Sequence, residues 1–206
     1  MVNAPALGEL PAGGTEVVGQ LLFLGSRGWL NEGNDRGVVG SDQMNAAGEW
    51  STWNVPCRSN DNAYAPLAVA TAQDLAAACT IGGYGGYVSP GGPPGAVLNT
   101  TWLYLSHDAG ATFHAVSQIG RQRFYVVNAL AYPEPGVILA ATQSGSSGAL
   151  LASYDDGRHW VTSYRGDVLS ISFVTGSQGF AIVMGAKGDS LVMTVDAGHH
   201  WEHVTF

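Results

Sequence analysis

Short apolar runs separated by polar, glycine-rich turns recur along the chain from residue 17 onward. Residues 168–173 alternate between apolar and polar side chains, which is typical of a β-strand with one buried face. Residues 17–24 and 126–132 are apolar runs of strand length. No apolar run reaches the ~18 residues that a membrane-spanning helix needs. The pattern therefore predicts many short strands, no long helix and no membrane span.

One eight-residue pattern, Ser/Thr-x-Asp-x-Gly-x-x-Trp/Phe, occurs at residues 106–113, 153–160 and 194–201. The first residues of successive copies are 47 and 41 positions apart, and a period in the forties is typical of repeat architectures. The Asp carboxylate can accept nearby backbone N–H groups, the Gly accepts a positive φ, and the aromatic ring can be buried under the turn. Each copy therefore predicts a hairpin turn, called a repeat turn below. The structural residues of the three repeat turns are Ser106, Asp108, Gly110, Phe113, Ser153, Asp155, Gly157, Trp160, Thr194, Asp196, Gly198 and Trp201.

The strands around these turns fall into four similar units. The units cover approximately residues 17–58, 65–120, 124–166 and 167–206, after a lead-in segment at residues 1–16. The first unit has a degenerate turn that keeps Gly48 and Trp50 but lacks the Asp, and residues 53–56 are its predicted outer strand. Four-stranded units at this period predict an all-β fold. The expected architecture is a β-propeller of about four four-stranded antiparallel blades, which is either a partial or a small propeller.

The repeat turns resemble the Asp-box, or BNR, repeat of sialidase-like propellers. The resemblance rests on the three motifs and, with their flanking strands, covers roughly the whole chain past residue 17. It implies that each turn joins the third and fourth strands of a blade, at the periphery and away from the ligand face. Propellers of this kind usually have more blades. We therefore expect an open ring with apolar faces on strands 17–24 and 168–173, which favours self-association or further blades in a longer protein.

Catalysis is the first function that the resemblance suggests. Sialidases hold the substrate carboxylate with three arginines, because a guanidinium can bind a carboxylate through two hydrogen bonds. The chain has seven arginines, but none lies in the Arg-Ile/Leu-Pro motif of that family. We assign no catalytic residue and favour a non-catalytic propeller that binds a carbohydrate or a protein. A sialidase-like glycoside hydrolase of the exo-sialidase type, or a fragment of one, and a structural subunit of a larger assembly remain the alternatives.

Ligand contacts are expected where polar or aromatic side chains gather near the ends of strands. Two arginines alternate just before the third unit, and three charged residues share one loop after residue 31. Two tyrosines lie in a Gly- and Pro-rich insertion at residues 82–95, and a tryptophan follows it. A solvated loop, or packing against an adjacent blade, is the structural alternative for each of these groups. The candidate ligand-binding residues are Arg121, Arg123, Glu32, Asp35, Arg36, Tyr84, Tyr87 and Trp102.

Composition narrows the remaining possibilities. The formal charge is −8 and there is no basic run, which excludes nucleic acid as an expected partner. The glycine-rich insertion lacks a Gly-Lys-Ser/Thr motif, and we expect no cofactor. Residues 199–203 contain three histidines and a glutamate, but an extended strand would divide them between two faces, so we expect no metal site. Cys57 and Cys79 either form a disulfide, as in an extracellular or cell-envelope protein, or are two buried thiols, as in a cytoplasmic one.

Overall fold

The computed structural model describes residues 18–34, 37–57, 65–81, 100–120, 126–144, 147–186 and 188–205. Within these ranges the chain forms sixteen β-strands and no helix, in four antiparallel sheets of four consecutive strands each. The predicted all-β fold with four four-stranded blades is confirmed.

The bounds of the strands are as follows. Blade 1 contains β1 (Val18–Leu24), β2 (Arg27–Asn34), β3 (Gly37–Met44) and β4 (Trp50–Thr52). Blade 2 contains β5 (Leu67–Val69), β6 (Leu75–Ile81), β7 (Thr100–Ser106) and β8 (His114–Gln118). Blade 3 contains β9 (Val126–Glu134), β10 (Val137–Ser144), β11 (Ser147–Ser153) and β12 (Val161–Arg165). Blade 4 contains β13 (Val168–Phe173), β14 (Gly179–Val183), β15 (Ser190–Thr194) and β16 (Glu202–His203).

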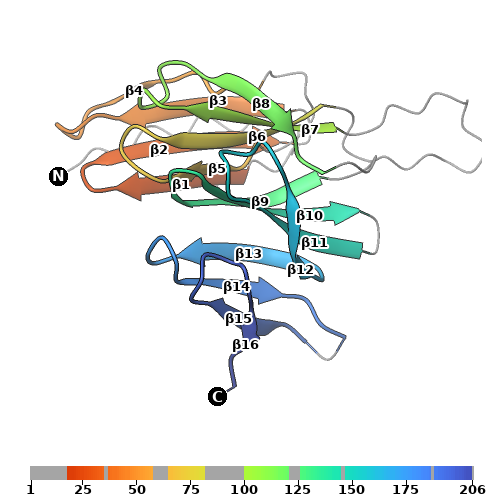
Figure 1. The fold of residues 1–206 in the computed structure, drawn as a ribbon. Helices are drawn as coiled ribbons and strands as arrows, with labels where there is room; N and C mark the ends of the chain where they lie inside the picture. Colours follow the sequence, from red (N-terminus) through yellow and green to blue (C-terminus); the bar gives the residue numbers. More distant parts are fainter. Residues whose placement is uncertain are drawn as a thin grey trace, which may run out of the picture.

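The sheets are arranged as a four-bladed β-propeller, with the first strand of each blade innermost. β1 lies against β5, β5 against β9, and β9 against β13. Figure 1 shows blade 1 and blade 4 at opposite ends of this series. Between β1 and β13 the described residues make no comparable strand contact, so the four blades form an arc that is open on that side.

The hydrophobic core lies between the blades. Alternate residues of β10 face opposite neighbours: Ile138 packs against blade 2, and Leu139 packs against blade 4. Leu103 of blade 2 belongs to the same cluster as Ile138, and all three side chains are fully buried. Because a central blade buries both faces, its middle strands are almost continuously apolar, as in the run Val137–Ala141.

Each repeat turn is closed by the same set of hydrogen bonds. In blade 2 the Ser106 hydroxyl accepts the Gly110 N–H at 2.8 Å and donates to Asp108 Oδ1 at 2.8 Å. Asp108 Oδ1 also accepts the Thr112 N–H at 2.8 Å. The turns of blades 3 and 4 repeat these three bonds at 2.8–2.9 Å, with His159 and His200 in the place of Thr112. The turn glycines have φ between 79° and 87°, a conformation that glycine adopts without strain.

The aromatic residue of the repeat turn has a different role from the expected one. We predicted a ring buried under its own turn, but Trp160 and Trp201 are half-buried and reach the preceding blade. The Trp160 indole N–H donates to Ser117 Oγ of blade 2 at 3.1 Å, and the Trp201 N–H donates to Ser163 Oγ of blade 3 at 2.8 Å. The two serine hydroxyls in turn donate to the carbonyl oxygens of the turn glycines 157 and 198. The repeat turn therefore joins adjacent blades.

Blade 1 departs from the prediction in its last strand. Its outer strand is Trp50–Thr52, and residues 53–56 are not a strand. The Trp53 backbone N–H still donates to the Ser41 carbonyl oxygen of β3 at 2.9 Å, and Pro56 then has no N–H to continue the pairing. The Trp53 indole N–H reaches blade 2, where it donates to the Gly110 carbonyl oxygen at 2.8 Å. Asn45 replaces the missing Asp of this turn, since its Oδ1 accepts the N–H groups of Ala47 and Glu49 at 2.9 and 3.1 Å.

Cys57 and Cys79 are disulfide-bonded, with their Cα atoms 5.2 Å apart. Both cysteines are buried beside Ala65. The bond links the end of blade 1 to β6 of blade 2, so these two blades are joined by a covalent crosslink as well as by packing.

The carboxylates of the repeat turns should make folding sensitive to acid. Hydrogen bonds from Thr112, then from Ser106, lower the pKa of Asp108 to about 2, and hydrogen bonds from His159 lower the pKa of Asp155 to about 2. Hydrogen bonds from His200 likewise lower the pKa of Asp196. Folded-state pKa values below the ordinary ~3.9 mean that these groups stabilise the fold above about pH 4 and lose that effect as the pH falls toward about 2.

We therefore expect the thermal unfolding midpoint to fall between about pH 4 and about pH 2, measured by circular dichroism. A variant that carries Asp108→Asn, Asp155→Asn and Asp196→Asn should have a lower midpoint at neutral pH and a smaller further decrease in acid. Parallel pH curves for the two proteins would contradict this origin of the acid sensitivity.

Candidate functional site

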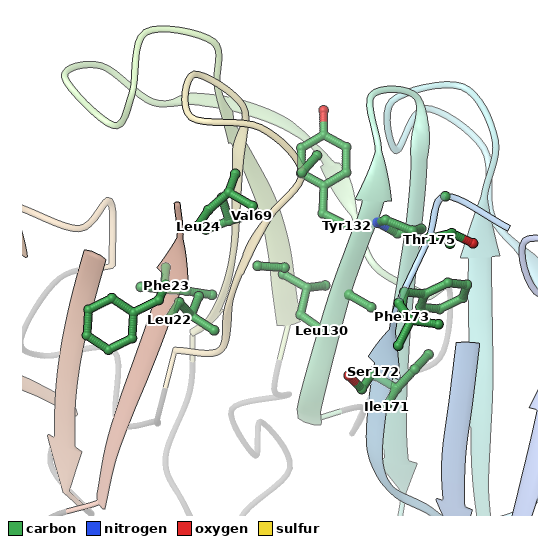
Figure 2. Close-up of a pocket in the computed structure, with 17 residues that line it drawn as sticks. Leu22, Phe23, Leu24, Val69, Leu130, Tyr132, Ile171, Ser172, Phe173 and Thr175 are labelled. Atoms are coloured by element: carbon green, nitrogen blue, oxygen red, sulfur yellow. The ribbon is translucent and has the colours of Figure 1, made fainter. Parts of the chain in front are cut away.

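A cavity of about 400 Å³ lies where the innermost strands of the four blades end (Figure 2). Its walls are the last residues of β1, β5, β9 and β13 and the turns that follow some of them. The repeat turns lie at the same end of the blades. The N–H groups of Ala109, Asp156 and Ala197 donate to backbone oxygens in the first turn of the same blade at 2.9–3.1 Å. The cavity thus opens at the end of the propeller that carries the repeat turns.

Most of the side chains that line the cavity are apolar, while polar atoms make up about half of the surface that faces it. Leu22, Leu67, Leu130 and Phe173 are among the lining residues and come one from each blade. In Figure 2, Leu22 and Leu130 lie on either side of the space between β1 and β9. None of the described residues that line it is Asp, Glu, His, Lys or Arg. The described lining therefore offers no carboxylate, imidazole, amine or guanidinium group for acid–base chemistry or carboxylate binding.

Tyr132 is the cavity residue with the most reactive side chain, but its environment keeps it neutral. Burial raises the pKa of Tyr132 to about 12, and the charges of Asp156 and Asp74 contribute further. The phenol is therefore protonated at neutral pH, and the described lining has no carboxylate to take its proton. Among the described residues, this cavity therefore holds no pair of a tyrosine and a carboxylate.

Two of the predicted ligand-binding residues lie in described parts of the chain, and they do not meet. Glu32 lies on β2 over Gly40, on the face of blade 1 that points away from blade 2. Trp102 lies on β7 of blade 2, beside Cys79 on one side and Gln118 on the other. Both are half-buried, and neither lines the cavity. The other candidates lie outside the described residues: Arg121, Arg123, Asp35, Arg36, Tyr84 and Tyr87.

The described arginines do not form a carboxylate clamp. Arg27 lies beside Gln43 in a second hollow of about 360 Å³, between blade 1 and the repeat turn of blade 2. Arg158 and Arg165 are exposed on blade 3. Because two of the three are on a different blade from Arg27 and outside both hollows, they cannot converge on one carboxylate.

The histidine-rich stretch is used within the fold. His200 Nδ1 lies 2.6 Å from the Asp196 carboxylate, and the His199 ring stacks on Tyr154 with centroids 3.9 Å apart. In the described ranges no group of three His, Cys, Asp or Glu side chains is placed to hold a metal ion. No helix that could cross a membrane was found in the same ranges.

Of the described residues that line the cavity, none is among the ligand-binding residues predicted from the sequence. Each wall segment occupies the same place in its unit, directly before the first turn of the blade. Aligning the four units on their repeat turns would have shown apolar residues recurring at that place. The pattern alone could not show that the four segments meet, because their convergence depends on how the blades pack.

No family model matches this chain, and no curated protein does either. Solved structures with a similar fold include the Hadza microbial sialidase Hz136, with 13% identity over 91% of this chain and 46% of that one, at a TM-score of 0.57. A polysaccharide lyase of family PL25, an ulvan lyase bound to -[GlcA(1-4)Rha3S]-, matches at 10% identity over 91% of this chain and 54% of that one, at a TM-score of 0.50. YCF48 bound to a D1 peptide matches at 15% identity over 67% of this chain and 39% of that one, at a TM-score of 0.44.

These likenesses define the class of the protein. It is a β-propeller whose blades resemble in fold those of a sialidase and a polysaccharide lyase. The chain spans less than two thirds of the length of each of the three structures. At such identities the likeness shows the fold alone, and function has to be argued from the site.

Proposed function

We propose that this chain is a non-catalytic binding propeller of the Asp-box type, whose central cavity takes a nonpolar side chain of a protein partner. The observation that carries the proposal is the cavity itself, which gathers apolar residues from all four blades. Its walls can bury a nonpolar group, at about 25 cal/mol for each Å² of apolar area removed from water. They supply none of the charged groups that hydrolysis of a glycoside needs.

The same walls favour a protein segment over a sugar. Carbohydrate hydroxyls need convergent hydrogen-bonding groups, and a buried hydroxyl without a partner costs free energy. Among the described lining side chains, polar groups are limited to Ser172, Thr175 and the Tyr132 phenol. A leucine, isoleucine or phenylalanine side chain makes no such demand.

Acidic turns at the same end of the propeller as the cavity add a preference for the flanking residues of the partner. Asp74, Asp108, Asp155 and Asp196 all lie in turns at this end of the propeller. Hydrogen bonds lower the pKa of the last three, so these carboxylates are ionised at neutral pH. A partner segment with lysine or arginine on either side of its nonpolar anchor would complement these acidic turns.

The disulfide supports a location outside the cytoplasm. Disulfides persist in oxidising compartments and are rare where thiols are kept reduced. We place the protein in an extracellular or cell-envelope compartment because Cys57 and Cys79 are bonded and buried between two blades.

Selection from a displayed random-peptide library should enrich peptides with a large nonpolar residue flanked by Lys or Arg. Affinity is then measured by fluorescence polarisation with a labelled synthetic peptide. Leu22→Gln places a polar amide in the cavity wall and should weaken binding about tenfold or more, by the free energy of burying a leucine-sized group. Val161→Gln, on an exposed residue of β12, is the matched control and should bind like the wild type.

Equal peptide affinity of the Leu22→Gln and wild-type proteins would show that the peptide binds outside the cavity and would contradict the proposal. Enrichment on a glycan array, or release of fluorophore from a fluorogenic sialoside, would replace the proposal with carbohydrate recognition or with glycosidase activity. Thermal melting of each variant shows that it is folded before binding is compared.

Removing the disulfide should cost stability. Cys57→Ser with Cys79→Ser, or reduction of the wild type, should lower the free energy of unfolding by ~2–4 kcal/mol, since the crosslink restricts the unfolded chain. Urea unfolding with and without reductant measures the difference. A wild-type midpoint that does not respond to reductant would show that the bond contributes nothing to stability.

A further inference from the structure

Blade 4 presents a face that matches the faces buried inside the propeller. Its residues are Phe180 and Ile182 on β14 and Leu191 and Met193 on β15, which pair as Phe180 with Met193 and Ile182 with Leu191. All four point away from blade 3, because their neighbours Ala181 and Val192 pack against blade 3. We call these four residues the outgoing face.

The repeat turns provide a register for comparing the blades. Met193 and Leu191 lie one and three residues before Thr194, as Leu105 and Leu103 lie before Ser106 in blade 2. In blade 3 the corresponding residues are Ala152 and Leu150. Their β-strand partners are equivalent too: Ala76 and Ala78 in blade 2, and Leu139 and Ala141 in blade 3. These equivalents are fully or almost fully buried by the blade that follows, whereas Ile182 of blade 4 is 41% exposed.

Blade 1 presents the other half of such a contact. On blade 1 the rings of Phe23 and Trp50 pack over Gly28 and form a unit with it. The glycine makes room for them, because a Cβ atom at this position would lie only 2.9 Å from the Phe23 ring and 3.2 Å from the Trp50 ring. The two aromatic rings lie 6.3 Å apart at 78°. Together with Leu21 on the same side of β1, they form what we call the incoming face.

Blade 4 contains the same unit where it meets blade 3. Phe173 and Trp201 lie 6.3 Å apart at 81°, and a Cβ on Gly179 would strike the Phe173 ring at 2.8 Å. There the Trp201 indole N–H donates to a serine of the preceding blade. In blade 1 the Trp50 Nε1 atom is buried and has no hydrogen-bond partner among the described residues, and the exposed member of the unit is Phe23, at 57%.

The structure assigns these two faces to one contact between two copies of this chain, with the outgoing face of blade 4 on the incoming face of the partner's blade 1. In each of the three contacts between neighbouring blades of the chain, the face of one blade that corresponds to the outgoing face packs on the face of the next blade that corresponds to the incoming face. Within one copy β1 and β13 do not make that contact. A second copy supplies both missing halves, and a two-fold arrangement with two such contacts closes a ring of eight blades.

Two carboxylates weaken the contact. Glu32 and Asp42 lie on the side of blade 1 that carries the incoming face, and Asp42 occupies the place that Leu151 and Val192 occupy in blades 3 and 4. Burying a carboxylate without a partner is costly. The dimer should therefore be of moderate affinity, and Asp42→Val should strengthen it.

Light scattering coupled to size exclusion, over a range of concentrations, tests the assignment. The wild type should pass from 21.4 kDa to twice that mass as concentration rises. Ile182→Asp in the outgoing face and Leu21→Asp in the incoming face should each raise the dissociation constant at least about tenfold, as for a charge placed in an interface core. Val161→Asp replaces an exposed β-branched residue outside both faces and should leave the dissociation constant unchanged.

Mixing the two disrupted variants separates this contact from any other. Ile182→Asp and Leu21→Asp together retain one intact outgoing face and one intact incoming face, so the mixture should form a heterodimer that neither variant forms alone. Monomeric wild type at every concentration would overturn the assignment. A dimer that only Ile182→Asp weakens would also overturn it, because that result describes two outgoing faces packed on each other.

Discussion

The hydrophobic core of this protein lies between its blades, and the rest of the structure depends on that constraint. A single antiparallel sheet has two faces and no interior, so it can bury side chains only against another sheet. Blades 2 and 3 are covered on both sides, which is why β6 and β10 consist almost entirely of buried residues. Stability in such a series comes from contacts between neighbours, and each blade is held by the blades on either side of it.

The repeat turn connects local chain geometry to these contacts between blades. A serine or threonine hydroxyl accepts the N–H of a glycine with positive φ, and this fixes the direction of the glycine carbonyl. In blades 3 and 4 that carbonyl accepts a serine hydroxyl from the preceding blade, and the aromatic residue three positions later donates to the same serine. At the contact between blades 1 and 2, Trp53 takes the place of the serine. The eight residues of a repeat turn therefore form a hairpin turn and also supply hydrogen bonds to the neighbouring blade.

The polar side chains of the described part of the chain are largely used to hold the fold. The carboxylates of the repeat turns are already engaged by hydroxyl, backbone or imidazole donors, so their low pKa values reflect structural bonds. Perturbed pKa values often mark functional sites, but hydrogen-bond networks that hold a fold produce them as well. Among the described residues that line the cavity, Tyr132 is the ionisable one, and its raised pKa follows first from burial.

The sequence by itself determined the features that depend on neighbouring residues. The all-β class, the four units and the hydrogen bonds of the repeat turns follow from alternation and from side chains within eight positions of one another. Only the tertiary structure decided which distant segments meet. The cavity requires one short segment from each blade, and the disulfide requires Cys57 and Cys79 to be brought within 5.2 Å by the packing of blade 1 on blade 2. Directly after the outer strand of blade 1, the Trp53 indole bonds to Gly110, a residue 57 positions away that no local pattern could identify.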